Sequence, residues 1–132
     1  MNADLGRRLV AEFVGTALLV IFGAGALVAA LDMGQGRLDY AGLGVVAISF
    51  GLVVAAVVYM FGTTSGAHIN PAVTFSLAAV RRFPWVEVGP SAVVQLAGAI
   101  VGALLINAIF GSHASDLSAS GGTVVGAGFT KA

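Results

Sequence analysis

Long stretches without any charged side chain are the feature that most constrains how this chain folds. They cover residues 13–31, 40–80 and 88–115, and contain 19, 41 and 28 residues. A helix needs about 20 residues to cross a hydrocarbon core of roughly 30 Å, so these lengths predict three membrane spans with residues to spare in the middle stretch. Only 9% of the 132 residues are charged, whereas soluble chains carry about 25%. We therefore predict an integral membrane protein of the all-α class.

The composition also excludes several classes of function. Six Lys and Arg balance six Asp and Glu, and the sequence shows no basic stripe that could bind nucleic acid. The sequence contains no cysteine, which excludes a disulfide scaffold, a thiolate metal site and a cysteine nucleophile. It shows no nucleophile triad, phosphate-binding loop or paired carboxylates, and His68 has no partner at metal-ligand spacing. We therefore predict that the chain is not an enzyme and binds no metal or cofactor.

The apolar stretches divide into three spans and one shorter segment. We predict spans at about 9–31, 40–61 and 88–110. Residues 62–70 are uncharged, yet they are too rich in Gly, Thr, Ser and Asn to face lipid as regular helix.

Helix can resume at Pro71, with Asn70 as its N-cap, and is expected to end near Val80, before two arginines and a proline. About ten helical residues rise roughly 15 Å, which is half a bilayer. Residues 111–132, rich in Gly, Ser, Ala and Thr, are expected to form a loop-like tail.

The half-length helix predicts a re-entrant segment, in which residues 62–80 enter the membrane and return to the side from which they came. Irregular backbone at membrane depth is tolerated only where protein buries it or where it lines water. The turn at Asn70 therefore predicts a water-lined site. With a cytoplasmic N-terminus, the positive-inside rule is obeyed. Four arginines then lie inside (Arg7, Arg8, Arg81 and Arg82), and Arg37 and Lys131 lie outside with the tail.

The polar turn carries groups that suit small neutral molecules. A helix N-terminus carries about half a positive charge, and here it lies near the membrane midplane beside the Asn70 amide. Ala67, His68 and Ile69 are expected to be extended and to offer their carbonyl oxygens as a row of acceptors. Glu12 lies about four residues inside the first span, where it either reaches toward water or is buried with hydrogen-bond partners.

Three motifs carry a resemblance to a known family. They are Ser-Gly-Ala-His-Ile-Asn-Pro-Ala-Val at 65–73, Ala-Glu-Phe-Val-Gly-Thr at 11–16 with Leu19, and Gln-Leu-Ala-Gly-Ala at 95–99. Together they resemble the aquaporin and glycerol-facilitator family of membrane channels over nearly the whole chain, most weakly in residues 111–132. Chains of that family contain two such halves in inverted orientation. This sequence has one Asn-Pro-Ala and lacks the arginine that follows the second one in the family.

The resemblance implies roles for particular residues. Phe50 lies twenty residues before Asn70, which is the position of the aromatic in the family's narrow outer constriction, and phenylalanine there is similar to water-selective members. Glycerol-conducting members tend to have tryptophan. By the same resemblance, the pore is lined by Phe50, Ala67, His68, Ile69, Asn70, Pro71 and Ala72, and its loop is supported by Glu12, Thr16 and Gln95.

The resemblance therefore implies one inverted-repeat half, residues 1–110, of a passive channel that conducts water, or glycerol and other small neutral solutes, and excludes ions and protons. The implied partners are membrane lipid, a complementary C-terminal half and, for complete pores, a homotetramer. A second hypothesis is a truncated or split, non-conducting fragment with a structural or interaction role, ending in the linker between halves. A third is a head-to-tail homodimer, against which the four-to-two split of basic residues argues.

Overall fold

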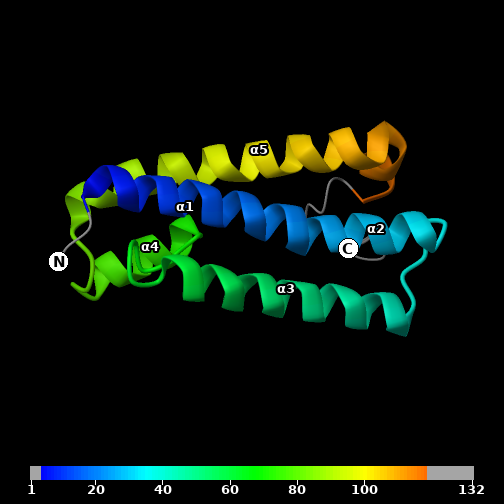
Figure 1. Ribbon diagram of the computed structural model, residues 1–132, viewed down its shortest axis with the longest axis horizontal. Helices are drawn as coiled ribbons and strands as arrows, with labels where there is room; N and C mark the ends of the chain where they lie inside the picture. The colour runs from blue at the N-terminus through cyan, green and yellow to red at the C-terminus, as the bar shows by residue number, and fades with distance from the viewer. Residues whose placement is uncertain (1–3, 119–132) are drawn as a thin grey trace, which may run out of the picture.

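The computed structural model describes residues 4–118, with side chains as far as Gly111. Its regular elements are α1 (Leu5–Leu19), the π-helical turn η1 (Val20–Ala24), α2 (Gly25–Met33), α3 (Tyr40–Phe61), α4 (Pro71–Ala79) and α5 (Trp85–Ser118). Helix α1, η1 and α2 form one continuous rod, and this rod lies side by side with α3 and α5 (Figure 1). The described part of the chain is thus a bundle of three long rods with one short helix.

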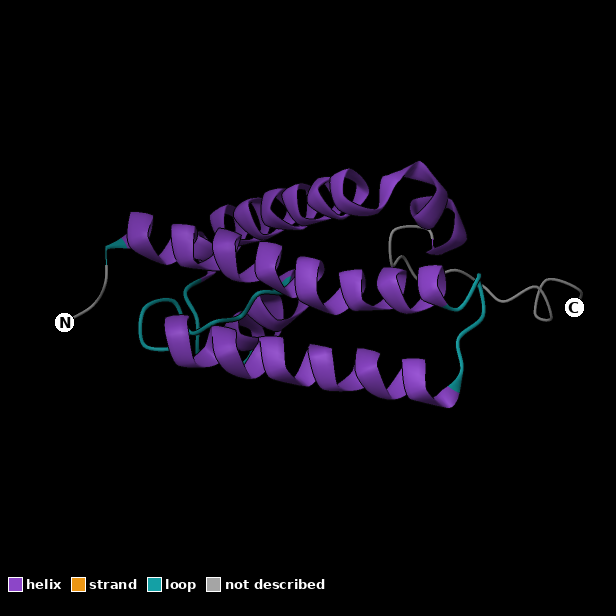
Figure 2. Cartoon of the chain, turned by 45° about the vertical axis from the view of Figure 1, so that its right-hand side comes forward, coloured by secondary structure: helices purple, strands orange, loops and turns teal. Residues whose placement is uncertain are grey.

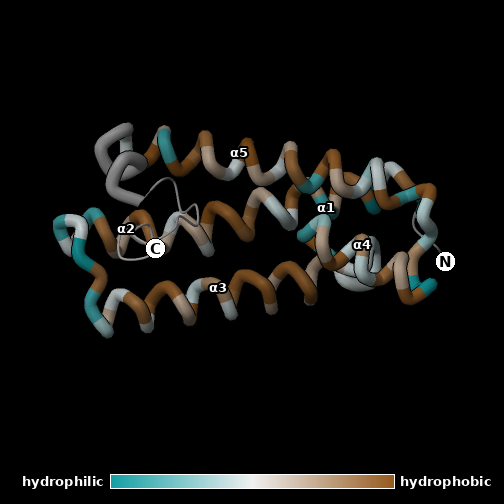
Figure 3. Tube along the Cα trace, turned by 180° about the vertical axis from the view of Figure 1, so that it is seen from behind, coloured by the Kyte–Doolittle hydropathy of each residue, from teal (hydrophilic) through white to brown (hydrophobic). Residues whose placement is uncertain are grey.

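Three helical stretches are long and apolar enough to cross a membrane. Among the described residues these are Leu5–Met33, Tyr40–Phe61 and Trp85–Gly111. Their outer faces are apolar as well, since large side chains such as Ile48 and Leu52 are 65% and 66% exposed. Figure 3 shows hydrophobic residues along the rods and many of the hydrophilic ones at the connections. The prediction of an all-α fold with three spans is confirmed.

Helix α4 is too short to cross a membrane. Its nine residues rise about 13.5 Å. Residues 62–70 turn back from the end of α3 and run between α1 and α3, and α4 then returns to the end of the bundle at which α5 begins (Figures 1 and 2). Pro71 occupies the first turn of α4, and the Asn70 side chain accepts a hydrogen bond from the Ala72 N–H at 2.8 Å. The predicted half-helix and its cap are therefore present.

Glycines allow α1 and α5 to approach closely. A Cβ added to Gly98 would collide with the Phe13 carbonyl group, and one added to Gly102 would lie 2.9 Å from the Ala17 carbonyl oxygen. Small residues at such positions bring membrane helices into contact where lipid supplies no hydrophobic driving force. An ion pair of 2.6 Å between Arg8 and Glu87 joins the same two helices near their N-terminal ends.

The end of α5 differs from the expected loop. Helix continues to Ser118, although Gly111 breaks it with φ 73° and ψ 176°. Glycine takes such a conformation without steric cost, and the residues that follow include Ala114 and Leu117, both of which have high helix propensity. The remainder of the expected tail, residues 119–132, lies outside the described residues.

Candidate functional site

The backbone just before α4 is irregular and strained. It was expected to be extended over residues 67–69, but Ala67 and Ile69 have φ values of 49° and 44°. An L-residue rarely enters this left-handed region, and a β-branched residue such as isoleucine does so least of all. Strain of this kind persists only where the surroundings fix the backbone. The partners of these residues therefore explain the loop.

Glu12 supplies most of those partners. It is 3% exposed, and its two carboxylate oxygens accept from the His68 N–H at 3.0 Å and from the Ile69 N–H at 2.7 Å. The Ser65 hydroxyl donates to Oε1 at 2.6 Å, and Gln95 Nε2 donates to Oε2 at 2.7 Å. Four donors thus converge on one buried carboxylate, and of the two alternatives for Glu12 the structure shows the buried one.

A second set of contacts ties the loop to α4 and α5 through Thr74. This residue is fully buried on α4, and its hydroxyl oxygen accepts from Gln95 Nε2 at 3.0 Å. The same oxygen lies 3.1 Å from His68 Nδ1 and 3.2 Å from the Asn70 carbonyl oxygen. Gln95 therefore bridges α1 and α4, because its Nε2 also bonds to Glu12.

Sequence reasoning missed Ser65 and Thr74 as supporting residues. Ser65 both donates to Glu12 and accepts from the Ala67 N–H at 3.1 Å. One signal was available for Thr74, since it lies one helical turn after Asn70 and a threonine hydroxyl there can reach the Asn70 carbonyl. For Ser65 the sequence offered only its place at the start of the motif at 65–73, and its partner lies 53 residues away in the sequence.

Thr16 does not support the loop in the way that was expected. Its hydroxyl donates to the Glu12 carbonyl oxygen at 2.7 Å, which is a bond within α1. A threonine in a helix commonly bonds back to the carbonyl four residues earlier. Thr16 is buried beside Glu12 on the same helix, so its hydroxyl is satisfied locally and is not directed to the loop.

The residues expected to line a pore fall into two groups. Asn70 and Ala72 are exposed, and His68 and Pro71 are half-buried. The side chains of Ala67 and Ile69 are buried instead, in a cluster with Val53 and Val57 of α3. These two residues can therefore offer only backbone groups to a passing molecule.

The orientation of the Asn70 amide follows from its cap. Its oxygen accepts from the Ala72 N–H, so the NH₂ group, which can only donate, is directed elsewhere. Because Asn70 is exposed, this donor and the positive end of α4 lie at the same surface.

Phe50 belongs to a different part of the bundle. It lies on α3 and is 39% exposed, and its ring lies against Gly23 of η1, where an added Cβ would come within 2.5 Å of the ring. The neighbouring Ser49 hydroxyl donates to the Phe22 carbonyl oxygen. The aromatic position is thus set by contacts between α3 and η1, and not by the Glu12 contacts.

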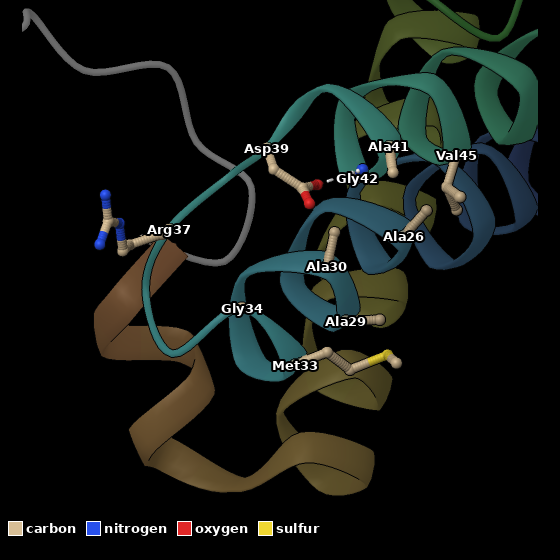
Figure 4. A pocket seen from close by; sticks show the side chains of 10 residues that line it. All are labelled: Ala26, Ala29, Ala30, Met33, Gly34, Arg37, Asp39, Ala41, Gly42 and Val45. Carbon is tan, nitrogen blue, oxygen red and sulfur yellow. Dashed lines mark hydrogen bonds between the residues drawn. The ribbon is translucent and has the colours of Figure 1, made fainter.

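A groove at the opposite end of the bundle is lined mainly by small apolar side chains. It has a volume of about 440 Å³ and lies between α2 and α3. Figure 4 shows small side chains along it and the Arg37 side chain directed away from it. The Asp39 carboxylate caps α3 by accepting from the Gly42 N–H at 2.7 Å. The polar groups that could handle a solute are therefore those around Asn70.

Three spans, a re-entrant half-helix and irregular backbone held by buried polar groups define a helical membrane protein of the kind that forms channels and transporters. Comparison with known proteins narrows this class. The family model described as "Major intrinsic protein" matches residues 1–131, and the chain belongs to that family.

Three relatives show how much of the family's length the chain covers. It is 41% identical to "Probable aquaporin AqpM" of Archaeoglobus fulgidus and 37% identical to "Aquaporin AqpM" of Methanothermobacter marburgensis, over 93% and 91% of its own length. It is 44% identical, over 78% of its length, to "Probable glycerol uptake facilitator protein" of Thermotoga maritima. The matched regions make up 55%, 54% and 44% of these relatives. The chain therefore spans about half the length of the relatives it matches.

Proposed function

We propose that this chain forms one half of a passive membrane pore for water or other small neutral solutes such as glycerol. The proposal rests on the hydrogen bonding and the exposure of Asn70. Its amide oxygen is occupied by the Ala72 N–H, its NH₂ group is free to donate, and the residue is exposed at the N-terminus of a half-length helix. Relatives named as an aquaporin and as a glycerol uptake facilitator support the same function.

The contacts of the loop favour a surface that offers acceptors and one donor. The N–H groups of Ala67, His68 and Ile69 are occupied by Ser65 and Glu12. Their carbonyl oxygens are the backbone groups left to accept from a solute, and Asn70 donates to it. A positive helix end beside this path disfavours cations.

A complementary half is needed to cover the loop. Asn70, Gly66 and Thr63 are exposed in this chain, and lipid leaves a backbone polar group unsatisfied at a cost of several kcal/mol. We propose that a second half, of inverted orientation, faces this surface. The resemblance to the aquaporin and glycerol-facilitator family implies that complete pores form homotetramers. The distribution of basic residues favours a cytoplasmic N-terminus.

A fused pore tests this function. It joins this chain to the C-terminal half of the Archaeoglobus fulgidus relative, and its water flux in proteoliposomes is measured by stopped-flow light scattering. Asn70→Asp replaces a donor by an acceptor and adds a negative charge at the positive helix end. We expect water flux to fall about fivefold, from the loss of one hydrogen bond of about 1 kcal/mol, and cation leakage to rise.

Gln35→Glu is the matched control, because it makes the same change from amide to carboxylate at an exposed residue of the connection between α2 and α3. It should leave water flux and cation exclusion as they are. Unchanged flux and unchanged ion exclusion in Asn70→Asp would remove Asn70 from its role. A fused pore that inserts and folds but conducts nothing would favour the non-conducting, structural role.

A further inference from the structure

The Phe50 ring packs directly on the backbone of Gly23. A Cβ built on this glycine would lie 2.5, 2.8 and 2.9 Å from three carbon atoms of the ring. Carbon atoms in contact lie about 3.5–4.0 Å apart, so a residue larger than glycine would force the ring away by about 1 Å. Gly23 is itself buried. The position of the ring therefore depends on the absence of a side chain at residue 23.

The turn that contains Gly23 is π-helical. Residues Val20–Ala24 form it, and the Gly25 N–H donates to the Val20 carbonyl oxygen five residues earlier. Such single turns are rare and are found frequently at functional sites. The extra residue changes which side chains of the rod face α3, and here it places a glycine opposite an aromatic side chain.

A hydrogen bond also joins α3 to η1, between the residues that immediately precede Phe50 and Gly23. The Ser49 hydroxyl donates to the Phe22 carbonyl oxygen. Ser49 precedes Phe50 on α3, and Phe22 precedes Gly23 on η1. The hydroxyl therefore fixes α3 against η1 directly beside the ring, while 39% of the Phe50 surface stays exposed.

We infer that Gly23 and Ser49 are positioning residues which set how far the Phe50 ring projects and thereby set the solute selectivity of the pore. This inference rests on the proposed function and on the place in the outer constriction that the family resemblance implies for Phe50. A methyl group at residue 23 pushes the ring toward its exposed side. The passage on that side becomes narrower, and glycerol is impeded more than the smaller water molecule.

The test compares permeability to glycerol with permeability to water in the fused pore. Gly23→Ala is expected to lower the glycerol-to-water ratio by roughly two- to tenfold, which corresponds to displacing one ring from its rotamer. Gly51→Ala is the matched control, because a Cβ on this neighbour of Phe50 has nothing within 4 Å. It should leave the ratio unchanged.

A second variant covers the case in which Gly23→Ala fails to fold. Ser49→Ala removes only the hydroxyl, so the ring is held less firmly, and the glycerol-to-water ratio should rise. A purely structural effect on folding would change the number of active pores, and both permeabilities together, but not their ratio. In a Phe50→Ala background neither substitution should alter the ratio, because the ring through which both act is absent.

The outcomes separate the inference from the function on which it rests. A conducting pore whose ratio is the same in Gly23→Ala, Ser49→Ala and the unsubstituted chain overturns the positioning role and leaves the channel function standing. A ratio that still shifts in the Phe50→Ala background also overturns it. If the unsubstituted fused pore folds and conducts neither solute, the channel function fails, and the inference fails with it.

Discussion

Replacing Glu12 by glutamine tests whether the buried carboxylate holds the strained loop. Each carboxylate oxygen accepts two hydrogen bonds, Oε1 from Ser65 and His68 and Oε2 from Ile69 and Gln95. Glutamine keeps the size of the side chain but replaces one of these oxygens by an NH₂ group, which can only donate. Whichever oxygen is replaced, the two donors that bonded to it then face the NH₂ group, which is itself a donor.

The cost follows from which of these donors can adapt. The Ser65 hydroxyl can rotate to accept, and the Gln95 amide can turn over, but the backbone N–H groups of His68 and Ile69 cannot change. One of the two is therefore left buried without an acceptor, at about 1–3 kcal/mol. The remaining bonds lose the assistance of the charge, which roughly doubles the strength of a hydrogen bond. The expected total loss of stability is about 2–5 kcal/mol.

Two measurements check this value. Unfolding of the chain in mixed detergent micelles gives the stability difference, and amide hydrogen exchange in nanodiscs reports on His68 and Ile69 individually. Glu87→Gln is the matched control, since it makes the same chemical change in the partly exposed ion pair with Arg8. Glutamine at residue 87 can still accept a hydrogen bond from Arg8 through its amide oxygen, so this variant is expected to lose less stability than Glu12→Gln. Equal stability of the two variants, with equally slow exchange at residues 68 and 69, would refute the role of Glu12.

Two further substitutions test the packing and the second set of loop contacts. Gly98→Ala places a Cβ against the Phe13 carbonyl group and is expected to destabilise the chain by about 1–3 kcal/mol in the same unfolding assay. Gly89→Ala is the control and should be neutral, because a Cβ on Gly89 has nothing within 4 Å. Equal effects of the two substitutions would argue against close approach of α1 and α5. Thr74→Val removes the acceptor of Gln95 Nε2 at nearly constant volume and should lower the free energy of unfolding by about 1–3 kcal/mol. Thr74→Ser keeps the hydroxyl and should lower it less. Equal losses in the two variants would show that the hydroxyl does not support the loop.

The parts of the fold that depend on local chemistry could be predicted from the sequence. Whether an uncharged stretch is long enough to span a membrane depends on its own length and not on its surroundings. Asn70 and Pro71 specify a helix start, the first by its hydrogen-bonding capacity and the second by its fixed φ. These features need no knowledge of the partner segments.

The conformation of the loop could not be predicted in this way. Residues 67–69 read as extended, because left-handed φ values at Ala67 and Ile69 are unfavourable for the residues alone. The structure adopts them because Glu12, from more than fifty residues earlier, bonds to the two amides that follow Ala67. The π turn at Val20–Ala24 also has no signature in the sequence. Both features depend on contacts between segments that are distant along the chain.

The burial of Glu12 also determines which backbone groups of the loop are already hydrogen-bonded. A charged side chain in the hydrocarbon region is costly unless it is paired, and here backbone N–H groups of the loop provide part of the pairing. Those N–H groups are consequently removed from the surface that a solute meets. In the proposed pore, the carbonyl oxygens of residues 67–69 would accept from a solute, and the Asn70 amide would donate to it. One carboxylate on α1 thus holds a strained backbone and occupies its N–H groups. In the proposed pore this would leave acceptors for a neutral hydrogen-bond donor such as water.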